Sequence, residues 1–311
     1  ISCQANIERV MDLLEQKPNV VDRTEVLRKY GDAFSPNKCN WEKIQGDIVF
    51  EDVSFMYPDG KEYVLEHFNL HVPAGMNVAI VGETGAGKST LVNLVGRFFE
   101  PTKGRILIDG VDYRERSQLW LHSQIGYVLQ NPHLFSGTVR ENIRYGRLDA
   151  LDEEIEEAAR NVSADMVVAK MEKGYDSDVG ESGGLLSTGE KQLISFARAV
   201  LANPAIFVLD EATSSIDTQT EKLIQDATNH LLKGHTSFVI AHRLSTIRQA
   251  DLILVVKDGK IIERGSHPEL LEQKGYYYEL YSRQFEEEEA MKVFAGATFA
   301  GETDWESVCQ P

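Results

Sequence analysis

The chain has 311 residues, of which 42% are hydrophobic and 26% are charged, and this composition is typical of a globular protein with a sizeable core. Its 49 acidic and 32 basic residues give a formal net charge of −17, which argues against binding the backbone of nucleic acid over a broad surface. We find no run of the roughly 18 apolar residues that a membrane span requires, and the 3 widely spaced cysteines suit a reducing cytosol.

Residues 1–16 are predicted to form an amphipathic helix, because apolar residues recur at helical spacing from Ile7 onward. Residues 17–46 are polar and contain prolines, so they are predicted to be a linker. We place a domain boundary near Gly46, which leaves residues 1–45 outside the main domain.

Short strands bounded by turn residues follow this boundary at 48–55 and 104–110, and they predict a small antiparallel layer. Continuous apolar runs then recur at four places in the chain: 77–81, 205–209, 237–241 and 252–256. Strands that are apolar on both faces and separated by helical stretches indicate a parallel sheet covered by helices. The sequence therefore predicts an α/β core.

Residues 130–187 carry helix signals, including capping-box spacing between Thr138 and Glu141 and a helix start at Asp152. We expect this stretch to be a helical insertion.

The segment 257–260 joins two β-rich runs and is predicted to be a hairpin turn, because Asp258 and Gly259 suit its positive φ angles. A run of glutamates and a Gly/Ala/Thr-rich tail follow Phe285. We expect this acidic tail, 286–311, to remain unfolded.

The segment GETGAGKS at 82–89 fits the pattern G-x-x-x-x-G-K-[ST], with Gly82, Gly87, Lys88 and Ser89 at its specified positions. Glycines let backbone N–H groups approach a phosphate chain, and the helix that follows offers its positive N-terminus. Lys88 would hold the β- and γ-phosphates, and the Ser89 hydroxyl would ligate Mg²⁺. The alternative is a Gly-rich turn that only caps a helix, but the buried strand before it and the apolar helix after it favour the phosphate loop.

The segment FVLDE at 207–211 ends a buried strand in two carboxylates, which suits a cation or a reacting water at the carboxyl edge of the sheet. Asp210 would hold Mg²⁺ through water, and Glu211 would orient or deprotonate the attacking water. The alternative is an acidic helix N-cap.

A GTPase or a small-molecule kinase would also carry the phosphate loop, but NKCN at 37–40 is not the guanine-reading pattern, and Glu211 favours an ATPase.

Two further polar residues close predicted strands. His242 could donate to the γ-phosphate or to the catalytic water, and Gln130 could touch the Mg²⁺ shell and act as a hinge. Taken alone, a strand-end histidine is more often structural, and such a glutamine is more often a surface residue.

Taken in order, these motifs resemble the nucleotide-binding domain of ATP-binding-cassette (ABC) transporters, of the exporter type that carries multidrug, lipid or peptide cargo. The resemblance spans residues 46–285. It implies a P-loop NTPase (RecA-like) core with a parallel sheet, a small antiparallel β-subdomain and an inserted helical subdomain. It also implies ATP and Mg²⁺ as cofactors, ATP hydrolysis coupled to transport, and a location at the cytoplasmic face of the cell membrane.

The resemblance also implies partners. These are the transmembrane domains of the same transporter and a second nucleotide-binding domain, with no nucleic acid. Residues 1–16 look like the cytosolic end of the last transmembrane helix, so the native polypeptide would continue upstream as a membrane domain.

Individual roles follow from the matched motifs. Tyr57 would stack on adenine, Gln130 would couple nucleotide to the membrane domains, Asp217 in SSID would lie in the dimer interface, and His242 would be the switch histidine. The segment 177–184 looks like the exporter-specific loop before the signature. Further nucleotide contacts would come from Gly82, Thr84, Gly85, Gly87, Lys88, Ser89 and Thr90. The catalytic residues would be Lys88, Gln130, Glu211 and His242, and the Mg²⁺ site would comprise Ser89, Gln130 and Asp210.

The signature departs from the family pattern LSGGQ, because this chain has LSTGE at residues 186–190. In family dimers the signature of one subunit closes over the ATP of the other, here through Ser187 and Gly189. Thr188 adds bulk and Glu190 brings negative charge near an anionic ligand, so we expect a weakened composite site. Ser187 and Glu190 also have capping-box spacing, so Glu190 would stabilise the helix start as well.

An intact Glu211 beside an altered signature suggests that the native partner is a different subunit, with a homodimer as the alternative. Two rival functions remain open: a soluble ABC-type ATPase that acts on DNA or ribosomes, and a regulatory module that binds ATP without turnover. The net charge argues against the first rival.

Overall fold

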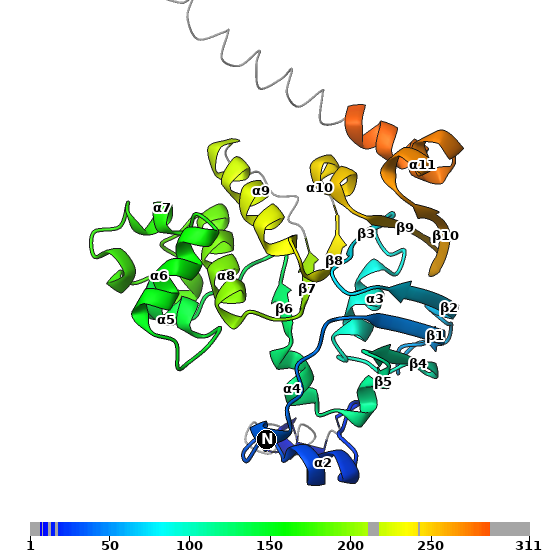
Figure 1. Ribbon diagram of the computed structural model, residues 1–311, viewed down its shortest axis with the longest axis horizontal. Coiled ribbons are helices and arrows are strands. Elements are labelled where there is room, and N and C mark those ends of the chain that lie inside the picture. Colours follow the sequence, from blue (N-terminus) through cyan, green and yellow to red (C-terminus); the bar gives the residue numbers. More distant parts are fainter. Residues whose placement is uncertain are drawn as a thin grey trace, which may run out of the picture.

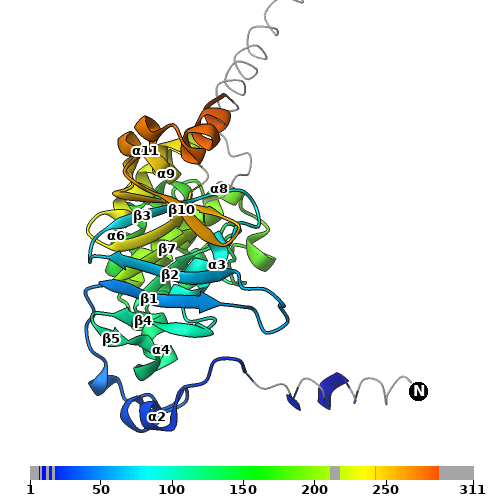
Figure 2. The same cartoon turned by 90° about the vertical axis from the view of Figure 1, so that its right-hand side faces the viewer.

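The computed structural model describes residues 18–210, 218–241 and 243–286, together with a few positions between Ile7 and Glu15. Within these residues the chain forms two sheets with helices packed around them (Figures 1 and 2). The described positions of the first predicted helix are helical and their side chains are exposed, while most of residues 1–16 lie outside the described part. In the described residues, no helix is both long and apolar enough to span a membrane.

The larger sheet has the strand order β10-β9-β3-β8-β7-β6, and all of its neighbouring strands run parallel except the antiparallel pair β9 and β10. Its strands are β3 (Asn77–Val81), β6 (Ile125–Val128), β7 (Ile206–Asp210), β8 (Thr236–Ile240), β9 (Leu252–Lys257) and β10 (Lys260–Gly265). The predicted parallel sheet is confirmed, with each of the four apolar runs supplying one strand.

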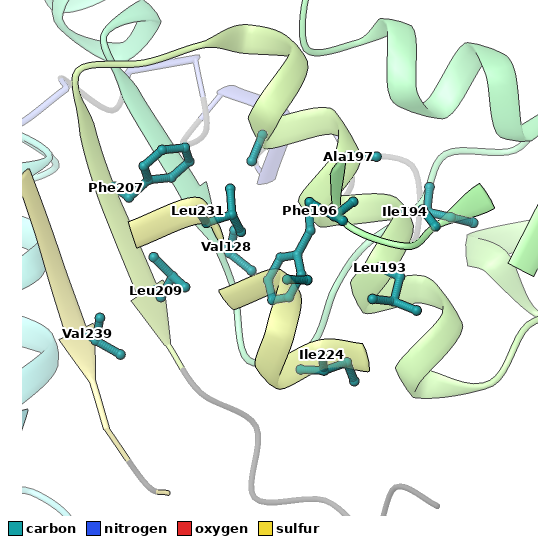
Figure 3. Close-up of a cluster of buried hydrophobic side chains, with 14 of the residues drawn as sticks. Val128, Leu193, Ile194, Phe196, Ala197, Phe207, Leu209, Ile224, Leu231 and Val239 are labelled. Atoms are coloured by element: carbon teal, nitrogen blue, oxygen red, sulfur yellow. The ribbon is translucent and has the colours of Figure 1, made fainter. Parts of the chain in front are cut away.

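Each central strand divides its side chains between two cores. In β3, Val78 and Ile80 enter the core shared with the antiparallel sheet, whereas Ala79 and Val81 enter the core beneath the other helices. Figure 3 shows this second core, to which β7 contributes Leu209 and the helices at Thr188–Ala202 and Thr218–Leu232 contribute Phe196 and Ile224. Burial on both faces is the reason that these strands read as continuous apolar runs.

The smaller sheet is antiparallel and has the order β2-β1-β4-β5. Its strands are β1 (Ile48–Phe55), β2 (Leu65–Val72), β4 (Lys103–Ile108) and β5 (Val111–Asp112). This confirms the expected antiparallel layer and adds β2, whose alternation of buried and exposed residues the sequence analysis did not recognise as a strand.

Two groups of elements lie on either side of β6 and β7 (Figure 1). On one side lie α3 (Lys88–Val95) and the antiparallel sheet; on the other lie α5 (Val139–Arg144), α6 (Asp152–Asn161), α7 (Asp165–Val168) and α8 (Thr188–Ala202). The remaining helices are α2 (Thr24–Tyr30), α4 (Gln118–Ser123), α9 (Thr218–Leu232), α10 (Leu244–Gln249) and α11 (His267–Gln273), the short 3₁₀ turns η1 (Lys38–Asn40), η2 (Tyr113–Glu115), η3 (Gly174–Asp176) and η4 (Glu181–Gly183), and a helical stretch at 276–286.

Local signals correctly located several of these elements. The predicted capping box at Thr138 and Glu141 is present, and α6 begins at Asp152 as expected. The hairpin turn at 257–260 is also confirmed, with φ of 49° at Asp258 and 72° at Gly259. The predicted tail lies outside the described residues from residue 287 onward.

The stretch predicted as a linker contains α2 and packs against α4 at one end of the molecule (Figures 1 and 2). Asp22 accepts a hydrogen bond from Arg97 at 2.9 Å and another from the backbone of Gln118 at 3.0 Å. Arg97 is 1% exposed and also donates to the carbonyl oxygen of Arg116. A buried arginine requires such partners, so Asp22 fastens this segment to the turn that follows α3.

Candidate functional site

The phosphate-loop motif lies between the carboxyl end of β3 and the start of α3. Gly87 is the N-cap residue of α3, with φ of 103°, and it supplies no side-chain cap. A Cβ on Gly82, where φ is 154°, would collide with the carbonyl oxygen of Val256. The first N–H groups of α3 therefore have no capping side chain, which is the arrangement that favours an anion at a helix N-terminus.

Lys88 is buried at the base of this loop, with 8% of its surface exposed. Its Nζ donates to the carbonyl oxygens of Gly82 at 2.7 Å and of Glu83 at 2.9 Å. Burial lowers the pKa of the Lys88 amine, and the negative charge of Asp210 opposes that shift. The loop thus holds a cation inside its curve, within electrostatic range of the carboxylate at the end of β7.

Asp210 is the last residue of β7, and Gln130 follows the neighbouring strand β6. Val128 in β6 pairs with Leu209 in β7, so both strands end at the same edge of the sheet. Asp210 is half-buried, and Gln130 is exposed two residues beyond β6. The next strand end is also near the loop strand, because the Ala241 N–H donates to the Ile80 carbonyl at 3.2 Å. Glu211, Asp217 and His242 lie outside the described residues.

Tyr57 lies against the phosphate-loop helix. Its hydroxyl is 2.9 Å from the Thr90 Oγ1, and its half-buried ring makes edge contacts with Phe55 and Phe99. The structure therefore brings together two residues that the resemblance assigned to nucleotide binding from separate motifs.

The donor set at the loop suits Mg²⁺ bound together with phosphate. Among the residues that the structure describes, no three His, Cys, Asp or Glu side chains cluster as a self-sufficient metal site. Mg²⁺ is usually held by one or two protein ligands together with substrate phosphates and water, and it needs no such cluster. The exposed Ser89 in the first turn of α3 and Asp210 at the sheet edge are ligands of this kind.

The signature residues belong to a different surface. Ser187 is the N-cap of α8, and its Oγ accepts from the Glu190 N–H at 3.3 Å. The Glu190 carboxylate in turn accepts from both the backbone N–H and the hydroxyl of Ser187, each at 2.9 Å. The predicted capping box is thus confirmed. Gly189 is buried in the same turn, and α8 lies across β6 and β7 from α3 (Figure 1).

Some contacts of the loop were not predicted. The Gly259 N–H donates to the Ala86 carbonyl at 3.0 Å, and Arg283 lies 3.9 Å from the Glu83 carboxylate. The sequence identified Gly259 as a turn residue, but it gave no signal that the turn reaches the phosphate loop.

A phosphate loop at the edge of a parallel sheet, with its lysine facing a strand-end aspartate, defines a P-loop nucleotide-binding protein. Residues 65–214 match the family described as ABC transporter. The chain belongs to this family and carries its nucleotide-binding domain.

Known relatives agree with this assignment. The chain is 49% identical over 287 residues to the uncharacterized ABC transporter ATP-binding protein YfiC of Bacillus subtilis, an alignment that covers 92% of this chain and 45% of YfiC. It is 49% identical over 276 residues to the fatty acid ABC transporter ATP-binding/permease protein of Mycobacterium tuberculosis (89% and 41% covered). It is 45% identical over 284 residues to the ATP-dependent lipid A-core flippase of Syntrophus aciditrophicus (91% and 45%).

Among solved structures, that of a bacterial Atm1-family ABC exporter with ATP bound superposes with a TM-score of 0.77 at 38% identity, covering 90% of this chain and 47% of that one. The chain thus spans less than half the length of each of these proteins, and its fold is that of an ABC ATPase with a parallel and an antiparallel sheet.

Proposed function

We propose that this chain is the ATP-binding and ATP-hydrolysing domain of an ABC exporter that works at the cytoplasmic face of a membrane. The observation that carries the proposal is the position of Lys88. This lysine is buried, its amine donates to two carbonyl oxygens of its own glycine loop, and the negative charge of Asp210 favours its charged form. A cation in this position complements the β- and γ-phosphates of ATP. Domain limits of 46–285, with a helical subdomain at about 130–187, are part of the proposal.

The described residues would divide the work at the nucleotide. Lys88 and the first N–H groups of α3 would bind the phosphates, and Tyr57 would stack on the adenine. Ser89, Asp210 and Gln130 would hold the Mg²⁺ that accompanies ATP, and this ion would neutralise phosphate charge. Other nucleotide contacts would come from Gly82, Thr84, Gly85, Gly87 and Thr90.

Glu211 and His242 complete the proposal from the sequence alone. Glu211 directly follows Asp210 and would orient the attacking water in line with the γ-phosphorus. His242 directly follows Ala241, which is bonded to β3, and would contact the γ-phosphate.

The signature residues would act on a second domain. Ser187 and Gly189 would close over ATP held by that domain, and Asp217 would lie in the interface between the two. Loss of the γ-phosphate after hydrolysis would remove charge from the interface and let it open. Gln130 would carry that opening to transmembrane domains, because it stands where β6 leads into the helical part.

We further infer that the second domain belongs to a different subunit. The support is the capping box, because Glu190 engages the Ser187 hydroxyl and places a carboxylate in the turn that would face phosphate. Fatty acids and lipid A are named for two similar proteins, so a lipid-like cargo is a reasonable class to test.

A single substitution tests the catalytic assignment. Glu211→Gln should leave ATP affinity within about twofold of wild type while phosphate release falls by roughly 100-fold or more, because the group that positions water is lost. ATP binding by calorimetry and phosphate release should be measured on the same sample, with and without a partner domain. An unchanged rate in Glu211→Gln would remove Glu211 from its role, and wild-type binding without release would instead support a regulatory module.

A further inference from the structure

We propose that the turn at Asp258 and Gly259, between β9 and β10, is a positioning element for the phosphate loop. It would fix the peptide group between Ala86 and Gly87, and so aim the Gly87 N–H at bound phosphate. This inference rests on the proposed nucleotide-binding function. Gly259 itself would touch no nucleotide.

The first support is a hydrogen bond between two segments that are distant in sequence. The Gly259 N–H donates to the Ala86 carbonyl at 3.0 Å. A trans peptide group is planar, with its C=O and N–H pointing in opposite directions. Because the hairpin holds the Ala86 carbonyl, the Gly87 N–H of the same peptide group must point away from the hairpin.

The second support is close packing of backbone on backbone. A Cβ on Gly259 would overlap the carbonyl oxygen of Val64, and a Cβ on Gly87 would lie 3.5 Å from the Gly259 Cα. Val64 cannot easily retreat, because its own N–H is bonded to the Phe55 carbonyl at 2.8 Å. The turn is therefore fitted between the loop and the antiparallel sheet, with no room for a side chain.

The third support is that the same strand also borders the other end of the loop. Val256, two residues before the turn, places its carbonyl oxygen where a Cβ of Gly82 would be. The end of β9 and the turn thus contact both glycines that frame the loop. Rigid support of this kind is what a pre-organised anion site requires, since groups that are already oriented need no rearrangement on binding.

A simpler explanation of Gly259 is that hairpin turns of this type require positive φ. The chain contains its own control for that explanation. Asp109 and Gly110 form a second Asp-Gly turn with nearly the same angles, 47° and 75°, against 49° and 72° at Asp258 and Gly259. A Cβ on Gly110 would meet nothing within 4 Å, so the two turns share their φ angles but differ in what surrounds the glycine.

The test compares Gly259→Ala with Gly110→Ala in the 311-residue chain. Thermal melting and the affinity for MgATP should be measured, with binding recorded well below both melting temperatures. Both variants carry the strain of alanine at positive φ. We expect Gly110→Ala to bind MgATP as wild type does, and Gly259→Ala to bind roughly tenfold or more weakly, because a misdirected hydrogen bond to a charged group loses about that much. The loss should be the same for tripolyphosphate, which lacks the nucleoside.

A second pair of variants covers the case in which Gly259→Ala does not fold. One glycine inserted after Asp258 displaces the Gly259 amide without adding a side chain, and one glycine inserted after Asp109 is its control. Weaker MgATP binding only in the first insertion supports the proposal. Equal affinities within either folded pair would overturn it. Absence of MgATP binding by the wild-type chain would instead overturn the proposed function.

Discussion

Helices α3 and α8 both begin at segments that we assign to nucleotide, but their first turns are built in opposite ways. Helix α3 starts at Gly87, in a left-handed conformation and without a side-chain cap. Helix α8 starts at Ser187, whose side chain and backbone are both engaged by Glu190. One helix leaves its first N–H groups to a ligand, whereas the other satisfies one of its own, that of Glu190, within its first turn.

The two helix starts also differ in which parts of the chain determine their shape. The open start of α3 depends on distant parts of the chain for its shape, namely Val256 and Gly259. The closed start of α8 is capped by residues three apart in sequence, Ser187 and Glu190. We infer that α3 is built to receive phosphate, and that α8 needs a rearranged Glu190 before its serine can do so.

The largest effect is expected from removing the lysine of the phosphate loop, at the uncapped start of α3. Lys88→Ala should weaken MgATP binding and reduce phosphate release by roughly 100-fold or more, because a preorganised cation is lost from a partly dry site. Calorimetry and a phosphate-release assay would check this, with exposed Lys170→Ala as the control. Unchanged affinity in Lys88→Ala would refute the site.

A smaller effect is expected from substitutions in the capped first turn of α8. The double change Thr188→Gly with Glu190→Gln should raise phosphate release of the chain acting with a second copy by roughly tenfold, because it removes like-charge repulsion on the order of 1–4 kcal/mol. Glutamine also supports a capping box, so α8 should remain capped. The rate should be compared with that of Glu269→Gln, which makes the same change in the capping box of α11. Equal rates would mean that Glu190 does not weaken the composite site.

The smallest effect separates capping from binding. Ser187→Ala and Ser266→Ala remove the N-cap hydroxyls of two similar capping boxes, and each should lower the free energy of unfolding by about 1 kcal/mol. Only Ser187→Ala should also weaken ATP-dependent association with a second domain. Denaturant unfolding and light scattering would check the two outcomes. If both variants associate alike, Ser187 serves α8 alone.

Much of the fold could be predicted because its signals are local. Burial on both faces makes the middle residues of β3, β7, β8 and β9 apolar, and β1 was predicted with the bounds that it has in the structure. The segment at 24–30 was missed, because α2 is held by partners far along the chain. Asp22 and Arg97 are 75 positions apart, and nothing in the sequence indicates that these two residues pair.

The candidate site divides in the same way. Glycine at 82 and 87 has a strict backbone requirement, so the loop leaves a recognisable pattern, and the nearness of Lys88 to Asp210 follows from parallel strands that end at one edge. The contact of Gly259 with Ala86 could not be predicted, because the turn alone already explains a glycine at that position. Both the turn and the close contact with the Val64 carbonyl require glycine at position 259, and the sequence reveals only the first requirement.

The buried Arg97 adds a mechanical consequence. Helix α3 is a stiff rod about 12 Å long at 1.5 Å per residue, gripped near its start by the Gly259 amide and just beyond its end by Asp22. We expect a tilt of α3 at its phosphate end to be transmitted to Asp22, and so to the segment that precedes β1.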